Sequence, residues 1–419
     1  MELKKEITQI AKNAKAASRF LSNLTSSEKN RILEEMAKNL QENKGQILKA
    51  NKKDIALAKS SHLSAAFIDR LSLDEKRIED MAKCLLDVSR LNDPVGTEIK
   101  SWQVLSGLQI HKVRVPIGVI AIIYESRPNV TADCIGLAFK SGNSVILRGG
   151  SESLNSNIAI FEALNAVIKK NNLPEGSINI ITTKNRQAIN ILLKLNDCID
   201  LVIPRGGEGL IKKVVALSRI PVIKHYKGIC HVYVDDYADL NMAEKICFNA
   251  KVQRPGVCNA MESMLVHRDA AIRFLPGMLK KFKEAGVEIR GCPLTQKISK
   301  DGIKKAKDSD YRTEFSDLIL AVKVVDSLEE AIMHINEYGS HHSDSIVTDD
   351  ENNAREFLKR VDSACVYVNA STRFTDGNQF GMGAEIGIST DKLHARGPMA
   401  LEELTSYKYA VWGSGQVRE

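Results

Sequence analysis

Short apolar runs that alternate with helical segments constrain the fold of this chain more than any other feature. Residues 117–124 (IGVIAIIY) contain no charged side chain. Fully apolar strands separated by helices are typical of a parallel sheet with both faces covered. The sequence therefore predicts a doubly wound α/β domain, of the kind that binds nucleotides at the carboxyl ends of its strands. The other expected strands are 144–147, 178–182, 201–203 and 221–223, with helices at 155–170 and 185–196.

The same alternation resumes after residue 225 and predicts a second α/β domain. Two domains agree with the length of 419 residues, which is more than an ordinary single-core domain contains. The expected strands are 231–234, 264–267, 318–325, 345–347 and 365–368, and the expected helices are 238–251, 270–285, 328–338 and 351–361.

The first 95 residues predict helices, and two of the helix starts carry a capping sequence. T-S-S-E at 25–28 and S-L-D-E at 72–75 both have capping-box spacing before apolar residues at helical intervals. Residues 102–115 alternate in polarity around Gly107, which predicts a β-hairpin, and residues 404–412 predict a final strand.

The expected domains follow from these segments. A dinucleotide-binding domain comprises 1–100 and 116–225, a catalytic domain comprises 226–400, and a small β element for oligomerisation comprises 101–115 and 401–419. The hairpin and the final strand are edge strands that could pair between subunits.

Composition excludes several classes of protein. Hydrophobic residues make up 43% and charged residues 26%, which is typical of a folded chain rather than a disordered one. The net charge of +7 is mild, and no basic run suggests nucleic-acid binding. No apolar run approaches the roughly 20 residues that span a bilayer. The amino terminus lacks the apolar stretch of a signal peptide, so we expect a cytoplasmic protein.

Eight cysteines are scattered without a CxxC pair, which favours reduced thiols. Cys258 is the most informative, because it follows the turn residues Pro255 and Gly256. Arg254 lies four residues upstream and could favour a thiolate. A buried structural cysteine explains the local sequence as well, so both interpretations stay open at this point.

Two glycine-rich stretches, SVILRGGS at 144–151 and LVIPRGGEG at 201–209, each end an apolar strand with Arg-Gly-Gly. Glycines there let a phosphate approach the backbone N–H groups at a helix start. Neither matches G-x-G-x-x-G, and a tight strand-to-helix turn explains either one alone. Two such loops in one parallel sheet, with Arg148 and Arg205, favour a dinucleotide site.

A resemblance to one protein family covers essentially the whole chain. The sequence resembles the γ-glutamyl phosphate reductases (glutamate-5-semialdehyde dehydrogenases), a branch of the aldehyde dehydrogenase superfamily. The most specific stretch is 325–346 (VDSLEEAIMHINEYGSHHSDSI), which matches the family pattern without a mismatch. The other stretches are 117–129 (IGVIAIIYESRPN), 257–265 (VCNAMESML) and 380–398 (FGMGAEIGISTDKLHARGP).

The resemblance implies an enzyme of proline biosynthesis that reduces L-glutamate 5-phosphate to the 5-semialdehyde with NADPH and releases phosphate. It places Cys258 as the nucleophile that forms a thioester. The oxyanions that develop need donors, for which we expect the Cys258 N–H and the Asn129 side chain. A turn role explains Asn129 equally well, and the superfamily's oxyanion position falls nearer Glu125.

The superfamily's water-activating Glu is replaced by His225, which suits an enzyme whose thioester must not react with water. The role of His225 stays open between phosphate binding and spacing. Arg148 matches the ribose-binding Lys, and Ser151 stands where NAD-selective relatives often have Glu, which favours NADP(H) although Glu152 is near. The other expected cofactor contacts are Gly206 and Gly207 at the pyrophosphate, Glu314 at the nicotinamide ribose and Phe380 beside the nicotinamide.

The substrate carries a carboxylate and an amine, for which Arg373 and Asp376 offer partners. Arg127, Lys227 and Arg254 are candidates for the leaving phosphate, although each is as often simply solvated. The histidines at 225, 231, 341 and 342, with Cys230, fit no standard zinc spacing, so we expect no metal.

The partners that we expect are a second copy of the chain, as a dimer or tetramer, and glutamate 5-kinase, which makes the labile acyl phosphate. The alternative functions are an aldehyde dehydrogenase for a free aldehyde and a catalytically silent nucleotide-binding protein.

Overall fold

The computed structural model describes residues 2–125, 127–299 and 302–418, and the chain divides into two compact units. Unit 1 is Met1–Lys224, Gly381–Gly387 and Met399–Glu419, and unit 2 is His225–Phe380 and Ile388–Pro398. The segment Gly381–Gly387, which we expected in the catalytic domain, belongs to unit 1. The reason is close packing: a Cβ on Gly383 would lie 2.8 Å from the Leu91 side chain, and Gly387 lies against Arg205.

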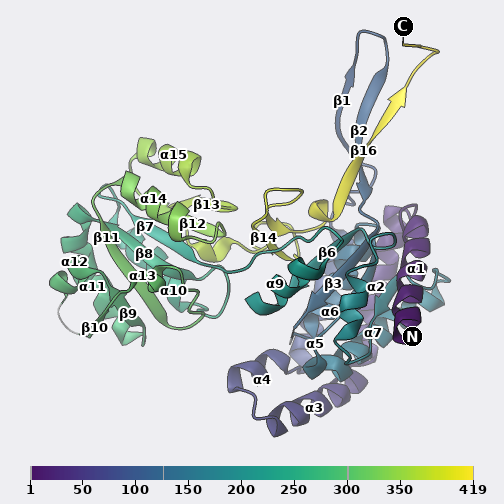
Figure 1. The fold of residues 1–419 in the computed structure, drawn as a ribbon, viewed down its shortest axis with the longest axis horizontal. Coiled ribbons are helices and arrows are strands. Elements are labelled where there is room, and N and C mark those ends of the chain that lie inside the picture. The colour runs from purple at the N-terminus through teal and green to yellow at the C-terminus, as the bar shows by residue number, and fades with distance from the viewer. Residues whose placement is uncertain (1, 126, 300–301, 419) are drawn as a thin grey trace. The chain divides into compact units, whose positions relative to one another are not determined.

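Unit 1 is built on a four-stranded parallel sheet with the order β5-β4-β3-β6. The strands are β3 (Val119–Tyr124), β4 (Ser144–Arg148), β5 (Ile178–Ile180) and β6 (Leu201–Arg205). Every residue of β3 is buried, because helices cover both faces of the sheet (Figure 1). One face packs against α1 and α8 through Ile7, Val119 and Val202, and α6 lies against β3 and β4. The predicted doubly wound arrangement is confirmed.

Helices fill the first 95 residues as predicted. The Thr25 capping box is present, because Thr25 Oγ1 accepts from the Glu28 amide at 3.3 Å and Glu28 accepts from the Thr25 amide at 2.8 Å. The second predicted box is wrong: Asp74 caps that helix, while Ser72 Oγ donates to Ile68 O at the end of the preceding one. The helices of unit 1 are α1 (Glu2–Leu21), α2 (Ser26–Glu42), α3 (Lys44–Ser60), α4 (Ala65–Leu71), α5 (Glu75–Arg90), α6 (Asn129–Lys140), η1 (Ser151–Ser153), α7 (Leu154–Lys170), α8 (Gln187–Leu192), α9 (Glu208–Leu217) and η3 (Glu402–Leu404).

The strand predicted at 221–223 is wrong. Only Val222 forms a bridge, with Val202. The segment bonds to β6 through Pro221 O, which accepts from the Val202 N–H, and through the Ile223 N–H, which donates to Val202 O. Pro221 has no amide hydrogen with which to extend this ladder. The helix predicted at 185–196 is also shorter than expected.

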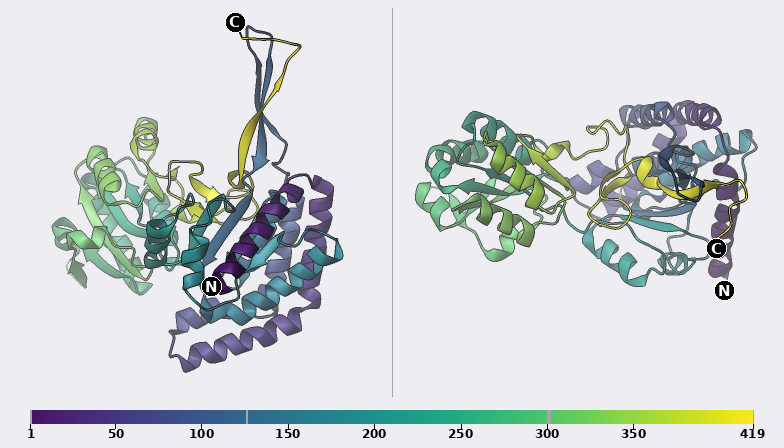
Figure 2. Two further views of the ribbon diagram at one scale, coloured as in Figure 1. Left: turned by 45° about the vertical axis from the view of Figure 1, so that its right-hand side comes forward. Right: turned by 90° about the horizontal axis from the view of Figure 1, so that it is seen from above.

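The predicted hairpin and final strand are confirmed, and they join within one chain. β1 (Glu98–Gln103), β2 (Gln109–Pro116) and β16 (Thr405–Trp412) form an antiparallel sheet in the order β1-β2-β16. Figure 2 shows this ribbon extending away from the rest of unit 1. It carries exposed apolar side chains, among them Trp102, Leu105, Tyr409 and Trp412.

Unit 2 is built on a seven-stranded parallel sheet with the order β10-β9-β11-β8-β7-β12-β13. Alternate residues of one strand face opposite layers: Met264 packs with α10 and α11, whereas Leu265 packs with α14 and α15. The strands are β7 (Cys230–Val234), β8 (Met261–His267), β9 (Glu288–Gly291), β10 (Ile303–Lys305), β11 (Ile319–Val325), β12 (Ser343–Val347) and β13 (Cys365–Val368).

The four helices predicted in unit 2 lie near their predicted positions, whereas the edge strand β10, its neighbour β9 and two short helices were not predicted. The helices are α10 (Leu240–Val252), α11 (Arg268–Glu284), α12 (Pro293–Ile298), α13 (Asp308–Tyr311), α14 (Leu328–Tyr338), α15 (Glu351–Arg360) and η2 (Thr372–Phe374). Two short strands, β14 (Gly387–Ser389) and β15 (Gly397–Met399), pair with each other. No helix in the described part of the chain is long and apolar enough to cross a membrane.

Candidate functional site

Cys258 lies in the short connection from α10 to β8 and is half-buried. A turn shapes this connection, because the Ala260 N–H donates to Val257 O at 3.0 Å. Burial raises the pKa of four other thiols, which keeps them protonated and weakly nucleophilic. These thiols belong to Cys84, Cys134, Cys230 and Cys247.

Two residues at and just before the start of β7 pack against the backbone of Cys258. A Cβ on Gly228 would lie only 2.0 Å from Cys258 O, so this position accepts no larger residue without a shift. Cys230 Sγ donates to the same carbonyl oxygen at 3.2 Å. Gly228 and Cys230 therefore fix the backbone of Cys258, a role that the sequence did not predict for them.

A buried polar chain continues behind Cys230. Its Sγ lies 3.7 Å from His342 Nδ1, which is 2.8 Å from Ser343 Oγ. Ser343 Oγ in turn lies 2.6 Å from Thr375 Oγ1. These contacts explain why the interior beneath Cys258 tolerates polar groups, since each has a partner.

His225, which the family resemblance places at the position of a catalytic Glu, packs edge-to-face on His342 with ring centroids 5.7 Å apart. Its Nδ1–H donates to Ile388 O at 2.9 Å, because a carbonyl oxygen can only accept. In the neutral ring the proton therefore resides on Nδ1, and Nε2 is left as an acceptor.

Arg373 and Asp376 line one pocket of about 380 Å³ in unit 2, with Asn249, Gln253, Phe374, Asn378 and Gln379. Asn259, the residue after the nucleophile, ties this segment to the Cys258 loop. Its Nδ2 donates to Thr375 O at 2.8 Å, and its carbonyl oxygen accepts from Thr372 Oγ1 at 2.7 Å. The structure thus brings the two predicted substrate residues together and connects them to Cys258.

The Arg373 guanidinium is held in a defined orientation. Its Nε donates to Gln253 Oε1 at 2.9 Å. Burial lowers the pKa of Arg373, the charge of Arg254 lowers it further, and Cys258 and Asp376 oppose the shift. The charge of Arg254 therefore acts on Arg373, although the Arg254 side chain is exposed.

The other predicted residues of unit 2 are partly accessible. Lys227 is half-buried and precedes Gly228. Glu314 is half-buried in the loop before β11. Burial raises the pKa of Glu262 to about 7, and the charge of Glu314 contributes to this shift. Phe380 is 40% exposed, and its ring meets that of Tyr367 at a centroid distance of 6.4 Å.

A second pocket, of about 400 Å³, lies in unit 1 at the carboxyl ends of the strands. Arg148 and Ser151, the predicted ribose contacts, both line it. So do the carboxylates Glu125 and Glu152 and three cations that the sequence did not single out: Lys184, Arg186 and Lys213. Arg148 is buried, and its Nε has no hydrogen-bond partner among the described residues. Lys184 and Arg186 follow β5, so only the parallel order of the strands, which gathers their carboxyl ends, places them beside Arg148.

Gly206 and Gly207 precede α9, as the predicted anion-binding turn requires. The Gly207 N–H donates to Glu125 Oε2 at 2.9 Å, so an anionic oxygen already occupies this position. Glu125 stands where the superfamily's oxyanion residue was expected. As a carboxylate it accepts rather than donates there.

Asn129 begins α6, and its Nδ2 donates to Asp133 Oδ2 at 3.0 Å. Burial raises the pKa of Asp133 to about 6. Arg127 and Asn129 belong to unit 1, whereas Cys258 belongs to unit 2, so their predicted roles at the reacting carbonyl stay predictions.

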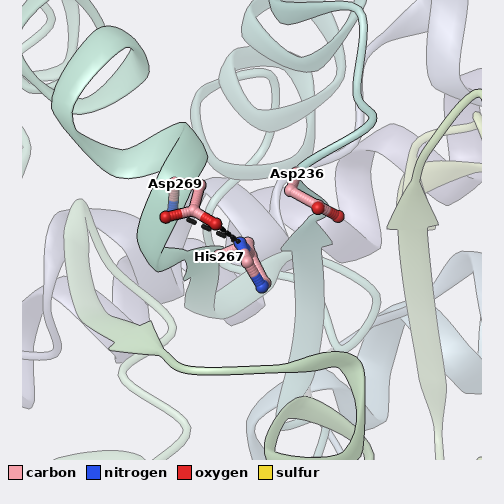
Figure 3. A group of neighbouring side chains, drawn as sticks. All are labelled: Asp236, His267 and Asp269. Carbon is pink, nitrogen blue, oxygen red and sulfur yellow. Dashed lines mark hydrogen bonds and ion pairs between the residues drawn. The ribbon is translucent and has the colours of Figure 1, made fainter.

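Asp236, His267 and Asp269 form a cluster whose possible ligand atoms all lie within 4.8 Å of one another (Figure 3). His267 caps α11, because its Nδ1 accepts from the Asp269 N–H at 3.2 Å. Helix capping accounts for this geometry, and we assign no metal to it.

Comparisons with known proteins identify the family of the chain. The model of the aldehyde dehydrogenase family matches residues 2–307 and 305–409. A protein of Thermodesulfovibrio yellowstonii named gamma-glutamyl phosphate reductase is 56% identical over 419 residues, which cover 100% of both chains. One of Clostridium acetobutylicum with the same name is 57% identical over 419 residues, with the same coverage. The crystal structure of gamma-glutamyl phosphate reductase from Thermotoga maritima superimposes with a TM-score of 0.96 at 48% identity, covering 99% of this chain and 100% of that one.

Proposed function

Because this chain belongs to the aldehyde dehydrogenase family, and within it to the gamma-glutamyl phosphate reductases, we propose that it reduces L-glutamate 5-phosphate to L-glutamate 5-semialdehyde with NADPH and releases phosphate. This is the second step of proline biosynthesis from glutamate. The observation that carries the proposal is the half-buried Cys258, linked through Asn259 to the pocket that Arg373 and Asp376 line.

Cys258 is the nucleophile of this proposal. Its thiolate attacks the acyl phosphate, the C–O bond to phosphate breaks, and a thioester forms on Sγ. NADPH supplies the hydride when it is bound. The resulting thiohemiacetal gives the aldehyde when the C–S bond breaks and the thiol is restored. The Cys258 N–H and the Asn129 amide are the proposed donors to the oxyanions.

Polar side chains of the chain select the substrate. Arg373, oriented by Gln253, pairs with the α-carboxylate, and Asp376 accepts from the ammonium group. Arg127, Lys227 and Arg254 are the proposed contacts of the departing phosphate. His225 in place of a carboxylate removes the general base that would direct water to the thioester.

The pocket of unit 1 fits a dinucleotide with a 2′-phosphate. Arg148 has an unpartnered buried Nε, three further cations line the same pocket, and position 151 carries Ser rather than a carboxylate. The Gly207 N–H, which donates to Glu125 Oε2, supports an anion-binding role for the turn before α9. We therefore propose Arg148, Ser151, Gly206 and Gly207 as contacts of NADP(H). Glu314 and Phe380 are the proposed contacts of its nicotinamide half.

We also propose that copies of this chain assemble into an oligomer. The β1-β2-β16 ribbon exposes Trp102, Tyr409 and Trp412, and both of its edge strands have an unpaired side. A second copy of the chain is the proposed partner of this ribbon, as a dimer or tetramer. Glutamate 5-kinase is a further proposed partner, because it makes the labile substrate, and both enzymes would act in the cytoplasm.

The reverse reaction tests the proposed function. We expect NADPH to form from glutamate 5-semialdehyde and NADP⁺ only when inorganic phosphate is present. Formation without phosphate would favour a dehydrogenase of free aldehydes. No formation under either condition, with NADP⁺ still bound, would favour a catalytically silent nucleotide-binding protein.

A further inference from the structure

A buried ion pair closes the base of the nucleophile loop, and the proposed reaction gives it no role. Lys251 lies in the last turn of α10 and Glu262 is the second residue of β8, so they flank the segment 252–261 that carries Cys258. Lys251 Nζ and Glu262 Oε2 are 2.7 Å apart, and both side chains are 0% exposed. The pair therefore fixes the separation of the two ends of this loop.

The same carboxylate also holds a second loop. Glu262 Oε1 accepts from the Ser316 N–H at 3.0 Å. Ser316 has a left-handed backbone with φ of 53°, which a residue other than glycine rarely adopts without support. Its segment, 313–317, carries Glu314, the proposed contact of the nicotinamide ribose.

The two loops also lie close together. A Cβ on Gly256, two residues before Cys258, would lie 3.6 Å from Ser316 O, which is ordinary van der Waals contact. Glu262 thus connects the two loops. One of its carboxylate oxygens pairs with Lys251 at the base of the Cys258 loop, and the other accepts from Ser316 in the Glu314 loop.

A buried ion pair is a costly way to stabilise a fold, because apolar residues of similar volume often serve as well. Directional hydrogen bonds do what apolar packing does not, since they set distances between segments. Maintaining a geometry therefore explains this pair better than stability does.

We propose that Lys251 and Glu262 are positioning residues that fix the Cys258 loop and the Glu314 loop at one spacing. The pair sets the reactivity of Cys258, and the second oxygen of Glu262 sets the position of Glu314. This inference rests on the proposed function only for the role of Glu314, because the reactivity of a thiol can be measured without substrate or cofactor.

Two variants separate the two roles. Lys251→Met removes the pair but leaves Glu262, which can take up a proton and still accept from Ser316. The double variant Lys251→Met/Glu262→Met removes both contacts and leaves no unpaired buried charge, so it keeps the test available if a single variant does not fold. The control is Lys281→Met/Glu244→Met, which removes an ion pair of 2.6 Å between partly exposed side chains of α10 and α11.

Three quantities are measured on each protein whose circular dichroism matches the wild type: the rate of Cys258 alkylation by iodoacetamide, the Kd of NADPH from fluorescence, and kcat. We expect Lys251→Met to alkylate Cys258 about tenfold more slowly and to lose about tenfold to a hundredfold in kcat, with the Kd of NADPH nearly unchanged, since small displacements of reacting groups are costly.

In the double variant we expect the Kd of NADPH to rise about tenfold as well, while the control changes every quantity less than about twofold. Wild-type alkylation and wild-type kcat in a folded double variant would overturn the proposal, because the pair would then serve stability alone. A wild type that alkylates as expected but fails the phosphate-dependent assay would contradict the proposed function and leave the positioning role standing.

Discussion

The α-carbon of Gly228 lies so close to the backbone of Cys258 that a Cβ there would come within 2.0 Å of Cys258 O. Backbone cannot move aside as a flexible side chain can. The backbone position of Cys258, the proposed nucleophile, therefore depends on a residue thirty positions away having no side chain.

Gly228→Ala tests this relationship. We expect a loss of about a hundredfold in kcat, since the Cys258 backbone must move by a large fraction of an ångström, and a destabilisation of about 1–3 kcal/mol from overpacking. Gly277→Ala is the control, because a Cβ at that position in α11 meets nothing within 4 Å. It should be neutral or stabilising. Equal activity of both variants would contradict the close packing.

Cys258→Ser tests the covalent mechanism. The variant should bind NADPH normally and lose turnover by several orders of magnitude, because an unactivated hydroxyl is a much weaker nucleophile than a thiolate. Cys292→Ser is the control: this half-buried thiol of the same unit contacts Thr295 Oγ1 at 3.3 Å, a contact that serine can replace. Iodoacetamide should also label Cys258 before the other thiols. Near-normal turnover of Cys258→Ser would exclude the thioester.

Ser151→Glu tests cofactor selectivity. The new carboxylate would share a pocket with Arg148 and Arg186 and would repel a 2′-phosphate, so NADPH should weaken much more than NADH. Fluorescence titration of both cofactors measures the change. Ser151→Gln keeps the size of the new side chain without its charge and should discriminate little. Equal weakening of NADPH and NADH by Glu would place residue 151 away from the 2′-phosphate.

His225→Glu tests the fate of the thioester. The wild type should scarcely oxidise the semialdehyde without phosphate, whereas the variant gains a general base and should show modest phosphate-independent formation of NADPH. The gain stays small because a base that is about 1 Å out of place loses much of its effect. His225→Gln supplies no base and should show none. Strong phosphate-free activity of the wild type would contradict a strict reductase.

His334 should make the protein sensitive to acid. It is 4% exposed between Tyr311 and Tyr338, and burial lowers its pKa to about 2. An unfolded chain protonates this ring below about pH 6.5, whereas the folded protein does not until about pH 2. Stability is therefore lost as the pH falls below 6.5, by up to about 1.4 kcal/mol per pH unit.

His334→Phe keeps an aromatic ring and removes this titration. Between pH 7.5 and 5, the variant should lose about 2 kcal/mol less unfolding free energy than the wild type, as measured by denaturant titration. The exposed His62 is the control, and His62→Asn should leave the pH dependence unchanged. Parallel pH profiles of His334→Phe and the wild type would show that the His334 ring is already protonated in the folded state.

The local sequence determined those elements that depend on the spacing of apolar residues or on contacts between residues a few positions apart. The apolar run at 117–124 predicted β3, since a strand without polar residues needs cover on both faces. The spacing of Thr25 and Glu28 predicted a cap whose bonds span only three residues. The two Arg-Gly-Gly turns were also predicted from contiguous sequence, whereas the role of Cys258 was predicted only from the family resemblance.

Tertiary structure alone decided the contacts between residues that are distant in sequence. Gly228 carries no local sign of its contact with Cys258, and Lys184 and Arg186 join Arg148 only because parallel strands gather their carboxyl ends at one edge. The pairing of β16 with β2 and the membership of Gly381–Gly387 in unit 1 are of the same kind. The spacing of apolar residues predicts which face of a helix or strand a side chain lies on. Only the packing of the whole fold determines which residue, distant in sequence, that side chain contacts.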